Sequence, residues 1–287
     1  MKKLGFFLLS RSVFNLFFSL RNRSKLKILA YHGVDDRLQF RKQVEYLSKH
    51  YSFISLETLI DYYAAGKALP RHPLLITFDD GKMSVFDNAF PVLSEYAIPA
   101  VVFVCPEIIN TKSAFWWEAM EIAGDGIIQK IKKLPWDESE KIISGMKGQS
   151  KSAGGDENMS WKELEIINEK GISIANHTLT HPILPNCGNE REFRELNETR
   201  IILNDAGYYG NILAYPNGDY SDRTVDNARK SGIDMAFAFD HRVAELSGDR
   251  MTLSRLRMRP SYGIDRMRII LSGFYPFLLR LSGKIKT

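Results

Sequence analysis

The sequence has few cysteines and no long uninterrupted apolar run, and both absences narrow the classes of protein to which it can belong. Only Cys105 and Cys187 are present among 287 residues, too few for a disulfide framework or a four-sulfur zinc site. We therefore expect a reducing compartment, with Cys105 in the core and no sign of a reactive thiol at Cys187. A content of 44% hydrophobic and 25% charged residues excludes a disordered chain.

Acidic residues are almost missing from the two ends of the chain. Residues 1–27 carry seven Lys or Arg and no acid, and residues 250–287 carry nine against one Asp, so the ends hold +15 and the middle −10 of a net charge of +5. An enzyme acting on nucleic acid would carry its positive charge around its chemistry. We therefore expect no nucleic-acid partner.

Both basic ends are also rich in aromatic residues. The apolar run after Lys2 and Lys3 is interrupted by Arg11 and lacks a cleavage site, so it is not a signal peptide, and it is too short and broken to span a bilayer. Residues 1–26 and 261–287 predict amphipathic segments that lie on an anionic membrane surface, which places the protein in the cytoplasm as a peripheral membrane protein. Two alternatives remain: ordinary helices packed on the domain, or an uncleaved anchor that places the domain in the periplasm or outside the cell.

Between the ends, apolar runs typical of strands alternate with amphipathic stretches typical of helices. This alternation predicts an α/β domain with a parallel sheet, and about seven strands favour a barrel over a doubly wound sheet. The sequence after the first strand also lacks the glycine-rich loop of a doubly wound nucleotide-binding fold. The predicted strands are 27–32, 74–78, 100–104, 172–175, 212–215, 235–239 and 253–258, and the predicted helices are 40–49, 85–96, 161–169, 190–205 and 223–230.

We interpret residues 27–260 as one domain with an insertion at about 112–158. A capping box at Ser160 predicts that a helix starts directly after the insertion, and the glycine-rich stretch 148–155 is expected to be mobile. The insertion contains Phe115, Trp116 and Trp117. These rings are candidates for facing a sugar or a lipid, and the alternative is that they pack in the insertion's own core.

Two predicted strands end in residues suited to metal chemistry. Asp79 and Asp80 follow the strand at 74–78, and His177 and His181 follow the strand at 172–175. Active sites of parallel barrels form at the carboxyl ends of the strands. One carboxylate and two imidazoles make a three-ligand set that leaves a coordination position open, and the second carboxylate stays available for proton transfer. Zn²⁺ is the first expectation for this divalent metal site, and Fe, Co or Ni also suit the donors.

The two motifs Thr77-Phe78-Asp79-Asp80-Gly81 and His177-Thr178-Leu179-Thr180-His181-Pro182 resemble those of the NodB-homology polysaccharide deacetylases, carbohydrate esterase family 4. The resemblance extends over about residues 27–258. It implies a distorted (β/α)7 barrel, with Asp79 as the general base and Asp80, His177 and His181 as the metal ligands.

The third motif matches this family only in part. The segment Leu213-Ala214-Tyr215-Pro216-Asn217-Gly218 resembles the biosynthetic subgroup with Phe-Ala-Tyr-Pro-Tyr-Gly, and the arginine that orients the catalytic Asp in many members is Ala214 here. Tyr215 and Asn217 are the candidate oxyanion or substrate contacts. Because the family's tyrosine at the position of Asn217 acts through its backbone N–H, Asn217 can serve in the same way.

The family's C-terminal Leu-x-His motif, which supplies the general acid, has no histidine in this chain. Leu253-Ser254-Arg255 stands in its place, and arginine gives up no proton at neutral pH. Some biofilm poly-N-acetylglucosamine deacetylases place this histidine on the first strand, where this chain has His32. We therefore predict His32 as the acid, with Arg255 orienting Asp79 or holding substrate; the alternative for His32 is a structural hydrogen bond.

The motifs together predict a metal-dependent hydrolase that removes N-acetyl groups from N-acetylhexosamine units of a surface polysaccharide or its lipid-linked precursor. The partners expected are an N-acetylated glycan or glycolipid substrate and a membrane surface. One alternative is an O-acetyl esterase acting on a polysaccharide, which needs no strong acid. A non-catalytic sugar-binding module is the other, although the complete set of ligand residues argues against it.

Overall fold

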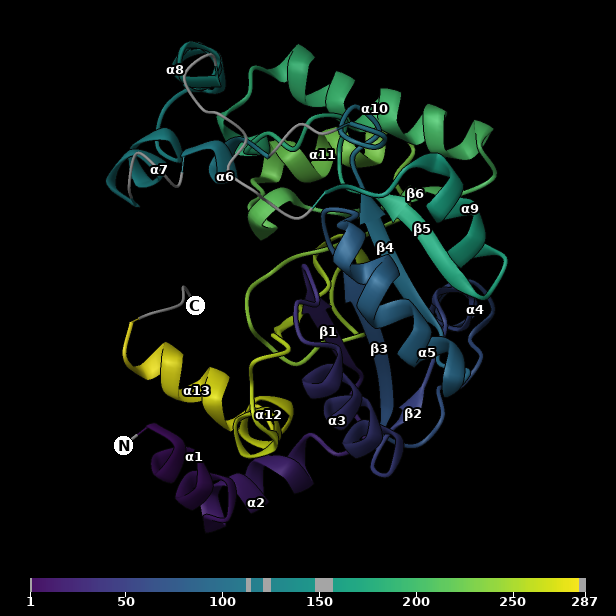
Figure 1. The fold of residues 1–287 in the computed structure, drawn as a ribbon, viewed down its shortest axis with the longest axis vertical. Coiled ribbons are helices and arrows are strands. Elements are labelled where there is room, and N and C mark those ends of the chain that lie inside the picture. Colours follow the sequence, from purple (N-terminus) through teal and green to yellow (C-terminus); the bar gives the residue numbers. More distant parts are fainter. Residues whose placement is uncertain (1, 112–114, 121–124, 148–156, 284–287) are drawn as a thin grey trace.

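The computed structural model describes residues 2–111, 115–120, 125–147 and 157–283, which form helices around a parallel sheet (Figure 1). The predicted mobile stretch 148–155 lies outside these residues. The strands are β1 Lys27–Tyr31, β2 Ser52–Phe53, β3 Pro73–Phe78, β4 Ala100–Val104, β5 Ile172–Asn176, β6 Tyr209–Ala214, β7 Met235–Phe237 and β8 Leu256–Arg257. The helices are α1 Lys2–Ser10, α2 Val13–Arg21, α3 Arg37–Ser48, α4 Leu56–Ala65, α5 Phe90–Glu95, α6 Trp116–Met120, α7 Asp125–Ile131, α8 Trp136–Lys147, α9 Trp161–Asn168, α10 Asn189–Asp205, α11 Asp222–Lys230, α12 Ile264–Leu271 and α13 Phe274–Leu281.

The sheet is parallel and curls back on itself. Its order is β7-β6-β5-β4-β3-β1-β8, with β2 pairing on β3. The segment before β8 closes the curl, because Leu253 pairs with Phe237 of β7, and β8 then pairs with β1 through Leu256 opposite Leu29. The predicted α/β class and the distorted barrel of the NodB type are therefore confirmed, and the first and last strands are neighbours.

The strands that carry the candidate site are covered on both faces. Every residue of β1, β3, β4 and β5 is buried. Alternate residues point to opposite sides, so Leu29 and Ile76 face the outer helices while Ile28 and Leu75 belong to a second cluster. Strands buried on both faces need near-continuous apolar runs, which explains why these strands were visible in the sequence.

Several elements differ from those predicted. Neither the two-residue β2 nor α4 was predicted. The single helix expected at 85–96 is divided into a π-helical turn, Val85–Ala89, followed by α5, because Pro91 near the start of α5 has no N–H to continue the helical bonding. The last predicted strand is shorter in the structure. Its first residue, Leu253, pairs with β7, and only Leu256 and Arg257, which form β8, pair with β1. The capping box at Ser160 is confirmed, and its backbone N–H donates to the Glu163 carboxylate at 2.8 Å.

The two termini pack against each other, as Figure 1 shows for α1, α2, α12 and α13. Phe18 of α2 lies against Phe274 and Phe277, with ring centroids 5.4 and 5.1 Å apart. Arg11 pairs with Asp265 at 2.7 Å, and the Asn22 side chain donates to the Ser272 carbonyl at 2.8 Å. The terminal helices therefore pack on one another, and their contact with a membrane stays a prediction.

Within the described residues, no single helix has both the length and the apolar content needed to cross a bilayer. The pair Leu4–Ser10 and Val13–Arg21, bent by 56°, meets the length and composition test only when the two helices are taken together.

Candidate active site

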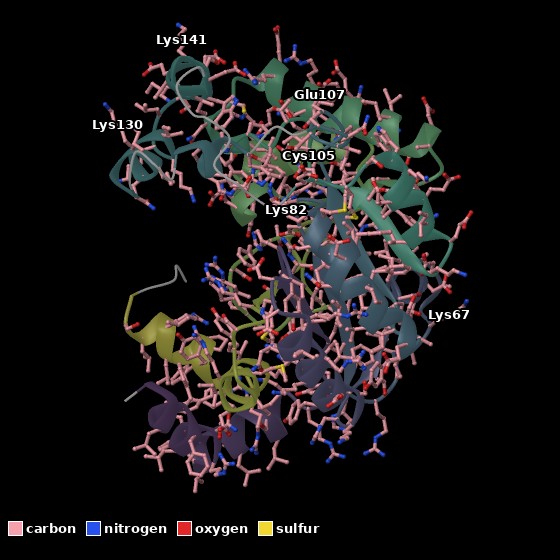
Figure 2. The ribbon with its side chains drawn as sticks, viewed as in Figure 1. Lys67, Lys82, Cys105, Glu107, Lys130 and Lys141 are labelled. Carbon is pink, nitrogen blue, oxygen red and sulfur yellow. The ribbon has the colours of Figure 1, made fainter. Side chains whose placement is uncertain are left out.

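Polar residues gather at the carboxyl ends of the strands, where the predicted motifs meet. Asp79 and Asp80 follow β3, His177 follows β5 and His32 follows β1. Figure 2 shows Lys82 and Cys105 at this end of the sheet, with the helices that carry Lys130 and Lys141 to their left. Of the eight non-glycine residues with positive φ in the described chain, four lie in the motif loops: Asp80, Thr178, His181 and Asn217. Strain of this kind concentrates at functional sites.

Asp80, His177 and His181 form a buried group with the geometry of a metal site. Their candidate ligand atoms all lie within 4.8 Å of one another. Nε2 of His177 lies 3.5 Å and Nε2 of His181 lies 3.6 Å from Oδ1 of Asp80. Ligands about 2.0–2.2 Å from a tetrahedral zinc ion are about 3.3–3.6 Å apart, so the spacing fits.

The hydrogen bonds around this group also fit a metal. Oδ1 of Asp80 is buried and has no hydrogen-bond partner among the described residues. Nδ1 of His177 lies 2.7 Å from the Ala214 carbonyl, so it donates there and leaves the lone pair of Nε2 facing Asp80. A buried acceptor without a donor is costly unless a cation satisfies it. The donor set and its orientation therefore suit a divalent metal.

Asp79 is held by a fully buried arginine. Arg255 donates two hydrogen bonds to its carboxylate, Nη1 to Oδ1 at 2.7 Å and Nη2 to Oδ2 at 2.9 Å. Nε of Arg255 donates to the Ala238 carbonyl at 2.9 Å, and Nη1 lies 3.2 Å from the hydroxyl of Thr77. This bidentate pair fixes the carboxylate plane of Asp79. Arg255 enters from the segment before β8, whereas Ala214 occupies the family's usual arginine position.

The charges in the site favour ionised carboxylates. Burial would raise the pKa of Asp79, but the charges of Arg255, His177 and His32 and the bonds from Arg255 outweigh it and hold the pKa below its ordinary value. Burial opposes ionisation of Asp80 as well, and the three histidines lower its pKa further still. Burial and the charge of His177 lower the pKa of His181 to about 3, so this imidazole is neutral, as a metal ligand must be.

A buried glutamate that sequence reasoning missed supports the histidine loop. Glu195 of α10 accepts hydrogen bonds from the backbone N–H groups of Leu179 and Thr180 at 3.0 and 2.9 Å, and from the Thr180 hydroxyl at 2.7 Å. Glu195 is completely buried. No local sequence signal marked it, because a glutamate on an amphipathic helix ordinarily faces solvent.

The third motif forms a tight turn, and its two candidate residues, Tyr215 and Asn217, lie in different surroundings. Tyr215 was a candidate substrate contact, but the structure does not place its side chain in the site. It is fully buried in a cluster with Leu196 of α10 and Val225 of α11, because strand alternation turns it to the opposite side from Ala214. Asn217 lies in the left-handed region, with φ 55°, and its side-chain oxygen accepts from Lys132 at 3.3 Å. Lys132 of the insertion is a second residue that sequence reasoning missed.

The insertion aromatics divide into two groups. The ring of Trp117 lies 4.4 Å and that of Phe115 lies 5.5 Å from His181, between centroids. Trp116, predicted with them as a possible substrate contact, instead packs against Trp136 in a cluster that also includes Ile183 and Cys187 of the histidine loop. Adjacent helical residues point in different directions, so one tryptophan fills the insertion core while its neighbour lies beside the site.

His32 lies beside the carboxylates from the end of β1. Its charge helps to lower the pKa of both Asp79 and Asp80, and its half-buried ring packs on Phe239 with centroids 5.6 Å apart. The pairing of β1 with β8 brings this end of β1 next to the segment that carries Arg255. His32 and Arg255 therefore both act on the Asp79 carboxylate.

Comparisons with known proteins identify the family of the chain. A family model described as polysaccharide deacetylase matches residues 66–236, more than half of the chain. The putative polysaccharide deacetylase YxkH of Bacillus subtilis is 22% identical over 246 residues, covering 83% of this chain and 72% of the relative. A poly-β-1,6-N-acetyl-D-glucosamine N-deacetylase of Staphylococcus epidermidis is 26% identical over 246 residues, covering 84% and 73%.

Solved structures share the fold at low sequence identity. IcaB from Ammonifex degensii superposes with a TM-score of 0.63 at 21% identity, covering 88% of this chain and 97% of that one. The Streptococcus pyogenes deacetylase PplD gives a TM-score of 0.65 at 18% identity, covering 87% and 99%. With more than half of its length matched by the family model, the chain belongs to the polysaccharide deacetylases of the NodB-homology type.

Proposed function

We propose that this deacetylase is a metal-dependent hydrolase that removes acetyl groups from the nitrogen of N-acetylhexosamine units in a surface polysaccharide or its lipid-linked precursor. The observation that carries the proposal is the buried Asp80, His177 and His181 group, with Asp79 held beside it by Arg255. One carboxylate is thus surrounded by candidate ligands, while the other is oriented and left available for proton transfer.

The metal would be held by Asp80, His177 and His181, with Zn²⁺ as the first candidate for this donor set. When bound, it supplies a Lewis acid that polarises the acetyl carbonyl and makes a water molecule more acidic. The Ala214 carbonyl keeps Nε2 of His177 directed at Asp80, and Glu195 holds the backbone of the loop between the two histidines. These supports reduce the reorganisation that binding an ion would otherwise require.

Asp79 is the general base. Its lowered pKa keeps it ionised at neutral pH, and the two bonds from Arg255 fix its orientation. It accepts a proton from the water that adds to the acetyl carbon. The backbone N–H of Asn217, in the tight turn after Pro216, stabilises the negative charge that forms on the carbonyl oxygen.

His32 is the general acid. An amine leaves a tetrahedral intermediate only when it is protonated, so breaking the carbon–nitrogen bond needs a donor on the leaving side. Arg255 cannot serve, because it keeps its protons and is engaged with Asp79. Protonation by His32 releases the free amino sugar, and acetate is the second product.

The substrate class follows from the insertion and from the relatives. Trp117 provides partly exposed aromatic surface beside His181, with Phe115 buried against it, and sugar rings pack well on such faces. A relative covering most of the chain is named a poly-β-1,6-N-acetyl-D-glucosamine N-deacetylase. We therefore propose a polymer of N-acetylglucosamine as the first substrate to test.

The deciding experiment measures metal content and acetate release from β-1,6-linked N-acetylglucosamine oligomers and from an O-acetylated polysaccharide. The wild type is compared with D79N, H32A and the control H241A; the ring of His241 also packs on Phe239, with centroids 5.0 Å apart. We expect both D79N and H32A to lose about 10²–10⁴-fold in the rate of N-deacetylation, the usual worth of a positioned base or acid. H241A should stay near wild type.

The same data separate the alternatives. The missing Leu-x-His histidine favours an O-acetyl esterase, since an alkoxide leaves more readily than an amide nitrogen and needs less help from an acid. Release from O-acetylated substrate alone, with H32A fully active, would replace the proposal by that esterase. A wild-type protein that binds no metal and releases no acetate would leave only a sugar-binding module.

A further inference from the structure

The apolar side chains left exposed in this protein are concentrated on the terminal helices. Of the fifteen large hydrophobic residues exposed among the described residues, ten belong to α1, α2 and α13. On α2 they recur at helical spacing, as Val13, Leu16, Phe17 and Leu20, each between 56% and 80% exposed. This spacing places them on one face of the helix.

The inward face of α2 carries the buried Asn15 and the ring of Phe18, which packs on Phe274. The Asn15 side chain is buried, donates to the Ser10 carbonyl at 2.9 Å and accepts from the Ser272 hydroxyl at 2.7 Å. A helix on the surface of a water-soluble domain buries most of its apolar side chains, whereas α2 leaves most of its large ones exposed. The packing of the two termini therefore does not satisfy the apolar face of α2, and it fixes the direction in which that face points.

A cationic cavity of about 580 Å³ lies directly behind this helix. Leu16 and Leu20 form part of its wall, and its cationic groups are Arg11, Arg23, Lys27 and Arg268, with two histidines and no acidic residue in the lining. The histidines are His50 and His72.

The cavity keeps unbalanced positive charge. Arg11 is paired with Asp265 outside the lining. The remaining three cations make no ion pair with a carboxylate in the part of the chain that the structure describes: Arg23 contacts His72 at 3.2 Å, and Lys27 donates to backbone carbonyls, at 2.7 Å for that of Lys25. Like charges held together without a counter-ion favour binding of an anion.

We propose that α1, α2 and α13 form a docking surface for an anionic phospholipid bilayer, and that the cavity between α2 and the barrel takes a phosphate-bearing lipid headgroup. The apolar face of α2 enters the interface while the cations of the cavity meet the headgroups, which is the arrangement of interfacial amphipathic helices. The surface lies at the amino-terminal ends of β1 and β3, where Lys27 and His72 are found, and thus opposite the metal group.

The test is co-sedimentation of the full chain with phosphatidylcholine vesicles prepared with and without phosphatidylglycerol. We expect strong binding only to the phosphatidylglycerol vesicles, with release by high salt. Removing the two cations in the double variant R23Q/R268Q should weaken binding roughly thirtyfold, since each charge near an anionic surface contributes about fivefold. The matched control K170Q/K230Q changes two exposed lysines, one in the turn after α9 and one at the end of α11, and should bind within about twofold of the wild type.

The apolar face is tested separately with F17E, matched by I201E on the far helix α10, where Ile201 is 43% exposed. F17E should lose vesicle binding and I201E should keep it, and both should release acetate at the wild-type rate as evidence that they fold. This control does not depend on lipid, so failure of docking is distinguishable from failure of the proposed deacetylase.

Other outcomes would overturn the proposal. Equal binding of wild type and R23Q/R268Q would show that the cavity takes no headgroup. Binding of inorganic phosphate that R23Q/R268Q abolishes, without any binding to vesicles, would assign the cavity to a soluble phosphate. Self-association that F17E abolishes, without any binding to vesicles, would make the α2 face a protein interface. Release from vesicles only by detergent would indicate that the bent α1–α2 pair is inserted in the bilayer.

Discussion

The two ends of the barrel differ in the charged groups that gather there. At the carboxyl ends of β3 and β5, Asp80, His177 and His181 are at most 3% exposed, and their candidate ligand atoms lie within 4.8 Å of one another. At the opposite end, Arg23, Lys27 and Arg268 line an open cavity without a carboxylate. The first end groups side chains that can bind a cation, and the second groups cations that can bind an anion. Chemistry and attachment can therefore be assigned to separate parts of one domain.

The same strands connect the two ends. Lys27 begins β1 and His32 follows it, while His72 precedes β3 and Asp79 follows it. The five residues of β1 span about 17 Å. A barrel docked by its base would hold the catalytic end at least that far from the surface, which suits a polymer that extends away from a membrane better than a single sugar attached to a lipid.

We expect the largest effect from a variant that inactivates only the catalytic end of the barrel. D80N removes the charged ligand of the metal group, and we expect acetate release to fall by at least about a thousandfold, because a bound metal lowers the activation barrier by several kcal/mol. Metal content should fall in parallel, and binding to vesicles should not change. The matched control is D226N, at an exposed aspartate of α11. Retention of both metal and activity by D80N would contradict the assignment of the ligands.

The next effect concerns Arg255, which is both a structural and a positioning residue. R255M leaves the Asp79 carboxylate buried without its partner and should lower the free energy of unfolding by about 3–5 kcal/mol. R255K restores the charge without the two parallel bonds, so we expect it to fold but to lose about 10²-fold in kcat with little change in KM, because the orientation of the base is lost.

Urea unfolding measures the stability of both variants, and steady-state kinetics separates positioning from folding. If R255K has the kcat of the wild type, the bidentate contact does not orient the base. If R255M is as stable as the wild type, Asp79 is satisfied by other groups.

The sequence predicted those parts of the fold and the site that depend on a local pattern of residues. Buried parallel strands need continuous apolar runs, so β3, β4 and β5 were found close to their observed bounds. Asp79, Asp80, His177 and His181 were visible because each pair follows such a strand, and carboxyl ends of parallel strands meet. The resemblance to a known family then supplied the closure of the barrel.

The residues that sequence reasoning missed act over long separations. Lys132 reaches Asn217 across 85 positions, and Glu195 supports its loop from the first half of a long helix. Nothing in their neighbourhoods distinguishes them from surface charges. Tyr215 was misplaced because a motif gives the order of residues but not the side of the strand to which each one points, and the alternation with Ala214 decided that.

A smaller effect distinguishes two adjacent tryptophans. W117A should raise KM for N-acetylglucosamine oligomers about fivefold, an aromatic contact being worth about 1 kcal/mol, while metal binding and stability stay near wild type. W116A should leave KM unchanged and destabilise the insertion by about 3–5 kcal/mol, because Trp116 is buried against Trp136. Kinetics with thermal unfolding measures both, and the reverse pattern would show that Trp116 is the ring that contacts substrate.

The smallest effect tests how firmly the terminal helices are joined to the barrel. Gly273, between α12 and α13, has a φ of 86°, and a Cβ there would lie 2.8 Å from Nδ2 of Asn22, the atom that donates to the Ser272 carbonyl. G66A is the matched control, since Gly66 has a φ of 64° with open space around it and its substitution adds backbone strain alone. We expect G66A to cost about 1 kcal/mol and G273A about 2 kcal/mol of the free energy of unfolding, the excess reporting the displaced Asn22 contact. Urea unfolding measures the difference, and acetate release should be unchanged in both variants because neither glycine is near the metal group. Equal costs for the two would mean that the contact between Asn22 and Ser272 contributes nothing to the packing of the terminal helices, which would then depend on their aromatic contacts and on the bonds of Arg11 and Asn15.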